Sequence, residues 1–375
     1  MAYQTPFGAQ TKTGRRPANG LRWRALRGKL FVSMGYLSRF IPLIAFAVIP
    51  IATLACSVQR TPSSLDSQQR GADITRLANP ESSLDDDSAS DADDAEPREL
   101  QANATQRYDL DHPNRKWSLP SSLKEISDIS LLSDNEVVCV EDERGIVYVY
   151  NLETSQVTDT VRFAAKGDYE GLAMVNSTVF VLRSDGRLFE LSSLKRHPSV
   201  RTYDLRLPIT ESEGLCFDPV HNRLLVAPKS RNQGGFGKDI RPIFAFTLPQ
   251  RVVSASPVLE ISLHDIRRFA KHHDLSLPRR LDREKNRMHA ALRFEPSAIA
   301  VHPISGDIFI LSSVDHLLVS CTRSGTITGY ALLDAGIFRR PEGLAFLPSG
   351  DLLISNEAAG KEATLLLFRS KHQGQ

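Results

Sequence analysis

The sequence predicts an all-β fold of the β-propeller class, and a repeated phrase is the main reason. Glu-Gly-Leu followed by a small residue occurs at 170–173, 213–216 and 342–345, and weaker copies begin at Ser127 and Ser297. The copies start at positions 127, 170, 213, 297 and 342, so successive starts lie 43, 43, 84 and 45 residues apart. A repeat of about 40–45 residues built from short strands is typical of a propeller in which each unit is one four-stranded blade.

The length of the repeat region predicts six four-stranded blades. Residues 116–369 would hold about six units of this size, and the gap of 84 residues is interpreted as two periods with one degenerate copy between them. The segment Tyr108-Asp109-Leu110 resembles Tyr203-Asp204-Leu205, which ends the second unit. We therefore expect the N-terminal strand to complete the final blade and close the ring, so that no sheet edge stays open.

Paired apolar runs separated by turn residues mark the blades along the chain. Hairpins are expected where 137–140 meets 146–150, 179–182 meets 188–191, and 308–311 meets 317–319. Residues 264–293 do not fit this pattern, because 265–271 have helical spacing and a basic run follows. With nine Lys or Arg against four Asp or Glu, this stretch is expected to be a helical, basic excursion. Its basic residues could form a solvated surface, or they could contact anionic lipid or another polyanion.

The N-terminal residues 1–56 have the pattern of a targeting or anchoring segment. Seven basic residues and no acidic one precede position 31, and an uncharged apolar run follows from 41 to 56. The run is short for a spanning helix, contains two prolines and ends in Leu54-Ala55-Cys56, which resembles the lipobox of bacterial lipoproteins apart from Thr53. That resemblance implies lipidation of Cys56 and a membrane anchor. The alternatives are an uncleaved signal anchor and a buried segment. Both a lipid anchor and a signal anchor would place the rest of the protein in the cell envelope, outside the cytoplasm.

Residues 57–106 are expected to form a disordered acidic tether before a propeller at 107–370. Nine acidic residues against one arginine lie in 80–99, and large apolar residues are scarce. The formal net charge of +2 is therefore a sum of opposite parts, which does not indicate a nucleic-acid partner. Cys139, Cys216 and Cys321 lie in or beside apolar runs without CxxC spacing, which favours buried thiols.

The glutamates of the repeated phrase are the main candidate site. In a propeller the first strand of each blade lines the central channel, so Glu170, Glu213 and Glu342 should converge with Asp128 at one mouth. Converging carboxylates repel one another, and a cation, protonation or basic side chains must compensate. The residues that end the second strands include Glu141, Arg183, Lys229, Asn356 and Glu357.

Two interpretations of this mouth stay open. Arg183 and Lys229 could neutralise Glu170 and Glu213 in internal ion pairs. Alternatively, the mouth could bind a divalent cation, most simply Ca²⁺, through oxygen ligands from Glu170, Glu213 and Glu342 with help from Asp128, Asn356 or Glu357. The glycine after each glutamate is interpreted as a need for close backbone approach near the axis or for a bulge.

Several phrases in order resemble the SdiA-regulated propeller family. They are EISDIS, DYEGLA, SEGLCFDP, EPSAIAVHP and PEGLAFLPSGDLLISNEA, and the resemblance covers about residues 115–370. It implies a bacterial, exported or lipid-anchored propeller that is compatible with calcium at the channel, without an established reaction. Ser297 stands where the stronger units carry Glu. A more distant resemblance to metal-dependent lactonases and phytase-like esterases implies that Glu342, Asn356 and Glu170 hold a cation that polarises a carbonyl or phosphoryl group.

Two functions are therefore carried forward. The first is a membrane-tethered, extracytoplasmic propeller that binds a ligand or a protein partner at the channel mouth, with a structural calcium ion. The second is a metal-dependent hydrolase that acts on a lactone or phosphoester at the same mouth. Propellers support both binding and catalysis, so the fold does not decide between them.

Overall fold

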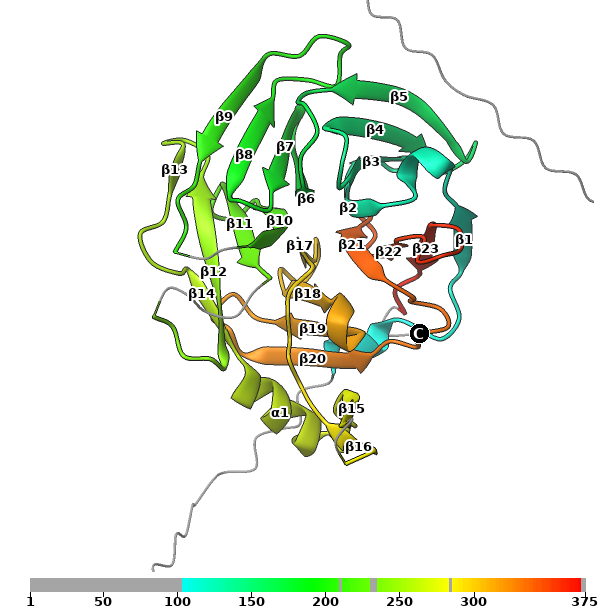
Figure 1. Ribbon diagram of the computed structural model, residues 1–375, viewed down its shortest axis with the longest axis vertical. Coiled ribbons are helices and arrows are strands. Elements are labelled where there is room, and N and C mark those ends of the chain that lie inside the picture. The colour runs from blue at the N-terminus through cyan, green and yellow to red at the C-terminus, as the bar shows by residue number, and fades with distance from the viewer. Residues whose placement is uncertain (1–102, 209–210, 230–234, 283–284, 372–375) are drawn as a thin grey trace, which may run out of the picture. The chain divides into compact units, whose positions relative to one another are not determined.

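The computed structural model describes residues 103–208, 211–229, 235–282 and 285–371, and these form a β-propeller. Figure 1 shows the blades following one another around a common axis, with β2, β6, β10, β17 and β21 innermost. Blade 1 contains β2 (Ile126–Ser133), β3 (Glu136–Glu141), β4 (Ile146–Asn151) and β5 (Gln156–Arg162), and blade 2 contains β6 (Tyr169–Val175), β7 (Thr178–Arg183), β8 (Arg187–Leu191) and β9 (Val200–Asp204). Blade 3 contains β10 (Ser212–Asp218), β11 (Arg223–Pro228), β12 (Ile240–Thr247), β13 (Val252–Val253) and β14 (Leu259–Ser262), and blade 4 contains β17 (Ala298–Val301), β18 (Ile308–Ser312), β19 (Leu317–Cys321) and β20 (Ile327–Leu332). Blade 5 contains β21 (Pro341–Phe346), β22 (Leu352–Asn356), β23 (Thr364–Phe368) and β1 (Arg115–Ser118).

The prediction of six blades is wrong, because the described residues form five. The gap of 84 residues between the phrases that start at Glu213 and Ser297 is one enlarged unit. Its fourth strand is split into β13 and β14, which pair with opposite ends of β12. The chain then forms α1 (Leu263–His272) and a separate two-stranded ribbon of β15 (Arg279–Asp282) and β16 (Arg287–Ala290) before it enters blade 4. An insertion of this length imitates a repeat unit when only spacing is counted.

The helical, basic excursion around 264–293 is confirmed in α1 and the ribbon. Ser262 caps α1 by accepting a hydrogen bond from the backbone N–H of Asp265, at 3.3 Å. Leu263, Ile266 and Ala270 form the buried stripe of the helix and join the core between blades 3 and 4. Figure 1 places α1 and the ribbon outside the ring, beside β20.

The N-terminal strand closes the ring as predicted, but a different segment does so. β1 pairs antiparallel with β23, and its Trp117 is buried and donates from Nε1 to the carbonyl of Leu152 at 2.8 Å. Tyr108, which was expected in this strand, instead lies in the core between blades 4 and 5 and donates to the carbonyl of Gly350 at 2.8 Å. Trp117 therefore anchors the closing strand in the core between blades 5 and 1, while Tyr108 packs in the core between blades 4 and 5.

Among the described residues, three short 3₁₀ helices accompany the blades. They are η1 (Ala104–Arg107), η2 (Ser121–Leu123) and η3 (Ser313–Asp315). The first follows Asn103, which is buried and both donates to and accepts from the backbone of Tyr330 in β20. Packing against the propeller therefore extends to Asn103, earlier than the boundary at 107 that the composition suggested.

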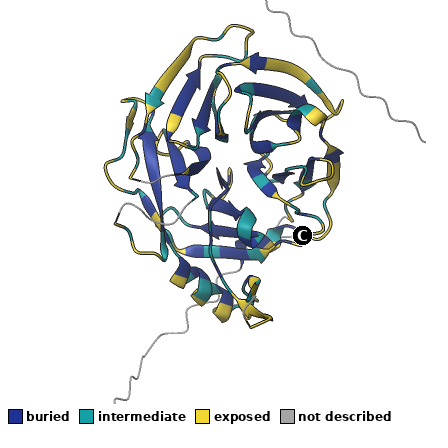
Figure 2. Cartoon of the chain, viewed as in Figure 1, coloured by how far each residue is buried: buried dark blue, intermediate teal, exposed yellow. Residues whose placement is uncertain are grey.

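Each pair of neighbouring blades shares one hydrophobic core. The third residue of each phrase packs against the preceding blade, and the fourth, which is small, faces the following one. Leu215, for example, joins the core between blades 2 and 3, whereas Cys216 joins the core between blades 3 and 4. Figure 2 shows this burial concentrated in the inner strands, with exposed residues on outer strands such as β5 and β9. The buried thiols predicted at Cys139, Cys216 and Cys321 are confirmed.

The glycine of the phrase is required by the closeness of neighbouring inner strands. A Cβ on Gly171 would lie 2.6 Å from the carbonyl oxygen of Glu213, and one on Gly343 would lie 3.0 Å from the backbone nitrogen of Ile129. The β6–β7 and β21–β22 pairings also shift register at these glycines. Both reasons proposed from the sequence, close approach and a bulge, therefore apply.

The predicted anchor and tether segments lie outside the described residues. These are residues 1–56 with Cys56, and residues 57–102. In the described part of the chain, no helix has the length and apolar character needed to cross a membrane.

We expect Gly171→Ala to lower the free energy of unfolding by about 2 kcal/mol, because the new methyl group meets backbone that cannot rotate away. Chemical denaturation would measure the loss. Gly237→Ala is the control, since its Cβ would meet only the Ile240 side chain, at 3.8 Å. Equal stability of the two variants would contradict the close approach of the inner strands.

Candidate functional site

The five copies of the phrase place equivalent residues at one end of the channel. Glu170, Glu213 and Glu342 lie near the starts of β6, β10 and β21, and Ser127 and Ser297 hold the same position in blades 1 and 4. Glu213 is 4% exposed, and Glu170 and Glu342 are half-buried. The three glutamates predicted from the sequence therefore share one mouth, which we call the acidic mouth.

Lys229 is the main cation of the acidic mouth. Its Nζ forms an ion pair with Oε1 of Glu213, as predicted. Burial acts to lower the pKa of Lys229, but the negative charges of Glu213, Glu170 and Glu342 outweigh burial and raise it. One lysine therefore interacts with three carboxyl groups that come from three different blades.

The three carboxyl groups resist ionisation. Burial is the largest cause in each case, and it raises the pKa of Glu213 to about 9, that of Glu170 to about 8 and that of Glu342 to about 7. Charge repulsion from Glu170 adds to the shift at Glu213, and repulsion from Asp168 adds to the shift at Glu170. Lys229 opposes the shift in all three, without cancelling it.

The predicted ion pair between Arg183 and Glu170 is not formed. The Arg183 guanidinium instead donates to both carboxylate oxygens of Asp185 in the same turn, at 2.5 and 2.9 Å. Glu141 is likewise occupied locally, since its Oε1 accepts from the backbone N–H and Nε of Arg144 at 2.7 and 3.0 Å. Arg183 and Glu141 therefore each bond to a residue two or three positions along the chain, and neither pairs with a glutamate of the repeated phrase.

Asp128 ties inner strands together. It stands where the strong phrases carry glycine, and its two carboxylate oxygens accept from the backbone N–H groups of Ile129 and Leu172, both at 2.8 Å. The backbone of Leu344 bonds to it as well. Burial raises the pKa of Asp128 well above its usual range, and these backbone donors act in the opposite direction. Asp128 thus links β2 to β6 and β21, which makes it a structural bridge rather than a free ligand.

Asn356 and Glu357 line a neighbouring cavity in blade 5. The cavity has a volume of about 460 Å³ and is also lined by Lys116 and Arg339. Asn356 donates to Thr364 Oγ1 at 3.1 Å. Arg340 connects this cavity to the acidic mouth, because its guanidinium pairs with Glu357 at 2.7 Å and with Glu342 at 3.3 Å.

A second acidic group was not predicted from the sequence. Glu125, Glu141 and Asp142 each present an oxygen within 4.8 Å of the others, and they are the one such group of three potential ligands among the described residues. Burial and the neighbouring acids raise the pKa of Asp142 to about 6. The strand register places Ile126 opposite Glu141, which brings Glu125 close to Glu141 and Asp142. The run of three acidic residues at 141–143 is the sequence feature that could have predicted this group.

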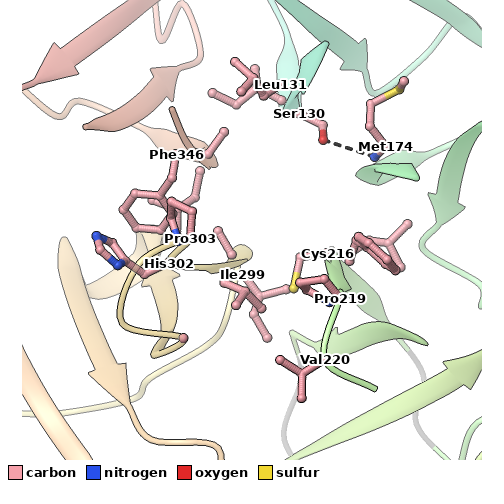
Figure 3. A pocket seen from close by; sticks show the side chains of 18 of the residues that line it. Ser130, Leu131, Met174, Cys216, Pro219, Val220, Ile299, His302, Pro303 and Phe346 are labelled. Carbon is pink, nitrogen blue, oxygen red and sulfur yellow. Dashed lines mark hydrogen bonds between the residues drawn. The ribbon is translucent and has the colours of Figure 1, made fainter. Parts of the chain in front are cut away.

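The other end of the channel is apolar. Five residues two positions after the phrase starts, and five more two positions further on, line a cavity of about 570 Å³. The first five are Ile129, Leu172, Leu215, Ile299 and Leu344, and the second five are Leu131, Met174, Phe217, Val301 and Phe346. Figure 3 shows Leu131, Met174 and Phe346 around the central space of this cavity. We call it the apolar mouth. The apolar residues two and four positions after each phrase start are the sequence pattern that could have predicted it.

The raised pKa values predict a stability that falls with pH. A carboxyl group whose pKa is higher in the folded than in the unfolded state stabilises fully below the unfolded value and loses this contribution as pH rises through the folded value. From about pH 4.5, the ordinary pKa of a glutamate, to about pH 9 the contribution of Glu213 should lower the melting temperature, and Glu213→Gln should flatten that fall because an amide does not titrate. The exposed Glu211 supplies the control, Glu211→Gln. Identical pH profiles for both variants would contradict the buried state of Glu213.

Among known proteins, the chain is similar to solved structures. No family model matches the chain, and no curated protein matches it. The glutaminyl cyclase of Myxococcus xanthus is 14% identical with a TM-score of 0.46, over 69% of this chain and 95% of that one. A luciferin-regenerating enzyme is 7% identical with a TM-score of 0.41, over 68% and 92%. A chain of a nidogen/laminin complex is 13% identical with a TM-score of 0.39, over 63% and 78%.

Proposed function

We propose that this protein is a membrane-tethered binding module of the cell envelope whose acidic mouth takes a cationic ligand, with Ca²⁺ as the simplest candidate. The observation that carries the proposal is the charge imbalance of the mouth. Three carboxyl groups from different blades share Lys229, and Arg340 divides its charge between Glu342 and Glu357. A bound cation would favour the ionised form of all three glutamates, and so would oppose both the burial and the charge repulsion that raise their pKa values.

The tether rests on sequence alone. A basic segment followed by an apolar run ending at Cys56 supports an anchor by lipidation or by an uncleaved signal. The acidic, apolar-poor stretch after it supports a flexible connection that would hold the propeller away from the membrane.

A metal-dependent hydrolase at the same mouth is the second candidate. One observation favours it: the pKa of Glu342 is raised to about 7, where a carboxyl group transfers protons effectively near neutral pH. Ser313 donates to Oε1 of Glu342 at 3.2 Å and would hold the carboxyl group in place. Turnover of a model lactone or phosphoester that is lost in Glu342→Gln would favour this role over binding alone.

The binding proposal predicts that Ca²⁺ stabilises the full chain. A cation that binds only the folded state raises stability by about 2.7 kcal/mol at a hundredfold excess over Kd. The affinity measured by calorimetry should increase from about pH 6 to about pH 9, because Ca²⁺ competes with protons for Glu170, Glu213 and Glu342.

Two variants locate the site. Glu342→Gln should weaken Ca²⁺ binding about tenfold or more, whereas the exposed control Glu211→Gln should leave it unchanged. Asp142→Asn removes a member of the second acidic group. If Asp142→Asn weakens Ca²⁺ binding and Glu342→Gln does not, the ion is bound by Glu125, Glu141 and Asp142. If Ca²⁺, Mg²⁺ and an organic dication such as ethylenediamine all produce neither heat nor a shift in melting, the cation-binding proposal fails.

A further inference from the structure

The apolar mouth has the form of a ligand site and lies at the opposite end of the inner strands from the glutamates. Its volume of about 570 Å³ falls within the range of about 300–1,000 Å³ that small-molecule sites occupy. Ile129, Leu172 and Leu344 belong to its inner ring and are at most 2% exposed. This ring forms an apolar floor of the cavity.

The walls and the rim leave apolar surface in contact with solvent. Leu131 and Met174 in the wall are half-buried, and Val220 and Ile304 at the rim are 69% and 66% exposed. Large exposed aliphatic side chains around a concave apolar surface are characteristic of a binding site, because each gains free energy when an apolar group covers it. Figure 3 shows Val220 and Pro303 on separate sides of the opening.

Arg323 places a guanidinium group at one side of the rim. Arg323 lines the cavity and its Nη1 pairs with Oδ1 of Asp218. Asp218 is fully buried, and its Oδ2 already accepts from Arg223 at 2.9 Å and contacts His221 Nδ1 at 2.8 Å. Burial acts to raise the pKa of Asp218, but its three basic partners lower it overall, so the carboxylate is charged. Two arginines share this single carboxylate, and Arg323 retains guanidinium donors that an anion at the rim could accept from.

We propose that the apolar mouth binds an amphipathic carboxylate, with its hydrocarbon chain in the cavity and its carboxylate at Arg323. The floor and walls match an alkyl or aromatic chain, and the arginine matches an acidic head group. The site is separate from the acidic mouth, because none of the three glutamates of that mouth lines this cavity, and neither does Lys229. Failure of the cation-binding proposal would leave this one standing.

Calorimetric titration of the full chain with hexanoate, octanoate and decanoate, each below its micelle concentration, tests the proposal. Affinity should rise about fourfold for each added methylene, because each one leaves water for the cavity. Decanol should bind more weakly than decanoate. Arg323→Gln should lower the affinity for decanoate about tenfold or more and leave that for decanol unchanged.

Two exposed valines of blade 3 provide a matched pair. Val220→Asp places a negative charge at the rim and should abolish decanoate binding, whereas Val252→Asp makes the same change on the outermost strand and should have no effect. Both positions are exposed, so neither variant should unfold. Absence of decanoate binding at millimolar concentration, affinity independent of chain length, or equal effects of the two valine variants would each overturn the proposal.

Discussion

The structure depends on how closely five inner strands can approach one axis. At Gly171 and Gly343 a single added carbon would collide with backbone of the neighbouring inner strand, which leaves no room for a side chain. Asp128 takes the equivalent place in blade 1 and turns the same closeness into hydrogen bonds to its neighbours. The small residue after each Leu serves the same need on the other face of the strand, where the blades converge.

This closeness gives the channel two chemically different ends. The phrase runs in the same direction in every blade, so a polar residue always comes first and apolar residues always follow. Repetition around the axis therefore collects glutamates at one mouth and aliphatic and aromatic side chains at the other. Two surfaces of opposite chemical character follow from one short sequence pattern, and Leu172, Leu215 and Ile299 belong to the apolar one.

The acidic mouth stores electrostatic free energy that the fold must offset. Glu213 is almost fully buried beside Glu170, and Lys229 compensates only part of the repulsion. The five inter-blade cores supply the offset, because each includes an apolar residue of an inner strand, and the core between blades 5 and 1 also includes Trp117 of the closing strand. A stable ring can therefore hold carboxyl groups with raised pKa values in a poorly solvated position.

The sequence by itself determined the propeller class, the closure by an N-terminal strand, the inserted helix and the convergence of Glu170, Glu213 and Glu342. The propeller class and the convergence of the glutamates follow from a pattern that occurs several times in the chain, and the helix follows from its own apolar spacing. The closing strand was expected at 108–110, whereas β1 (Arg115–Ser118) forms it. Only the tertiary structure decided the five blades, the pairing of Arg183 with Asp185, the bridging role of Asp128 and the cavity at the apolar mouth. Spacing cannot distinguish an insertion from a blade, and residue type cannot choose between two partners within reach of one side chain. Those outcomes depend on which groups the closed ring brings into contact, and a linear pattern does not contain that information.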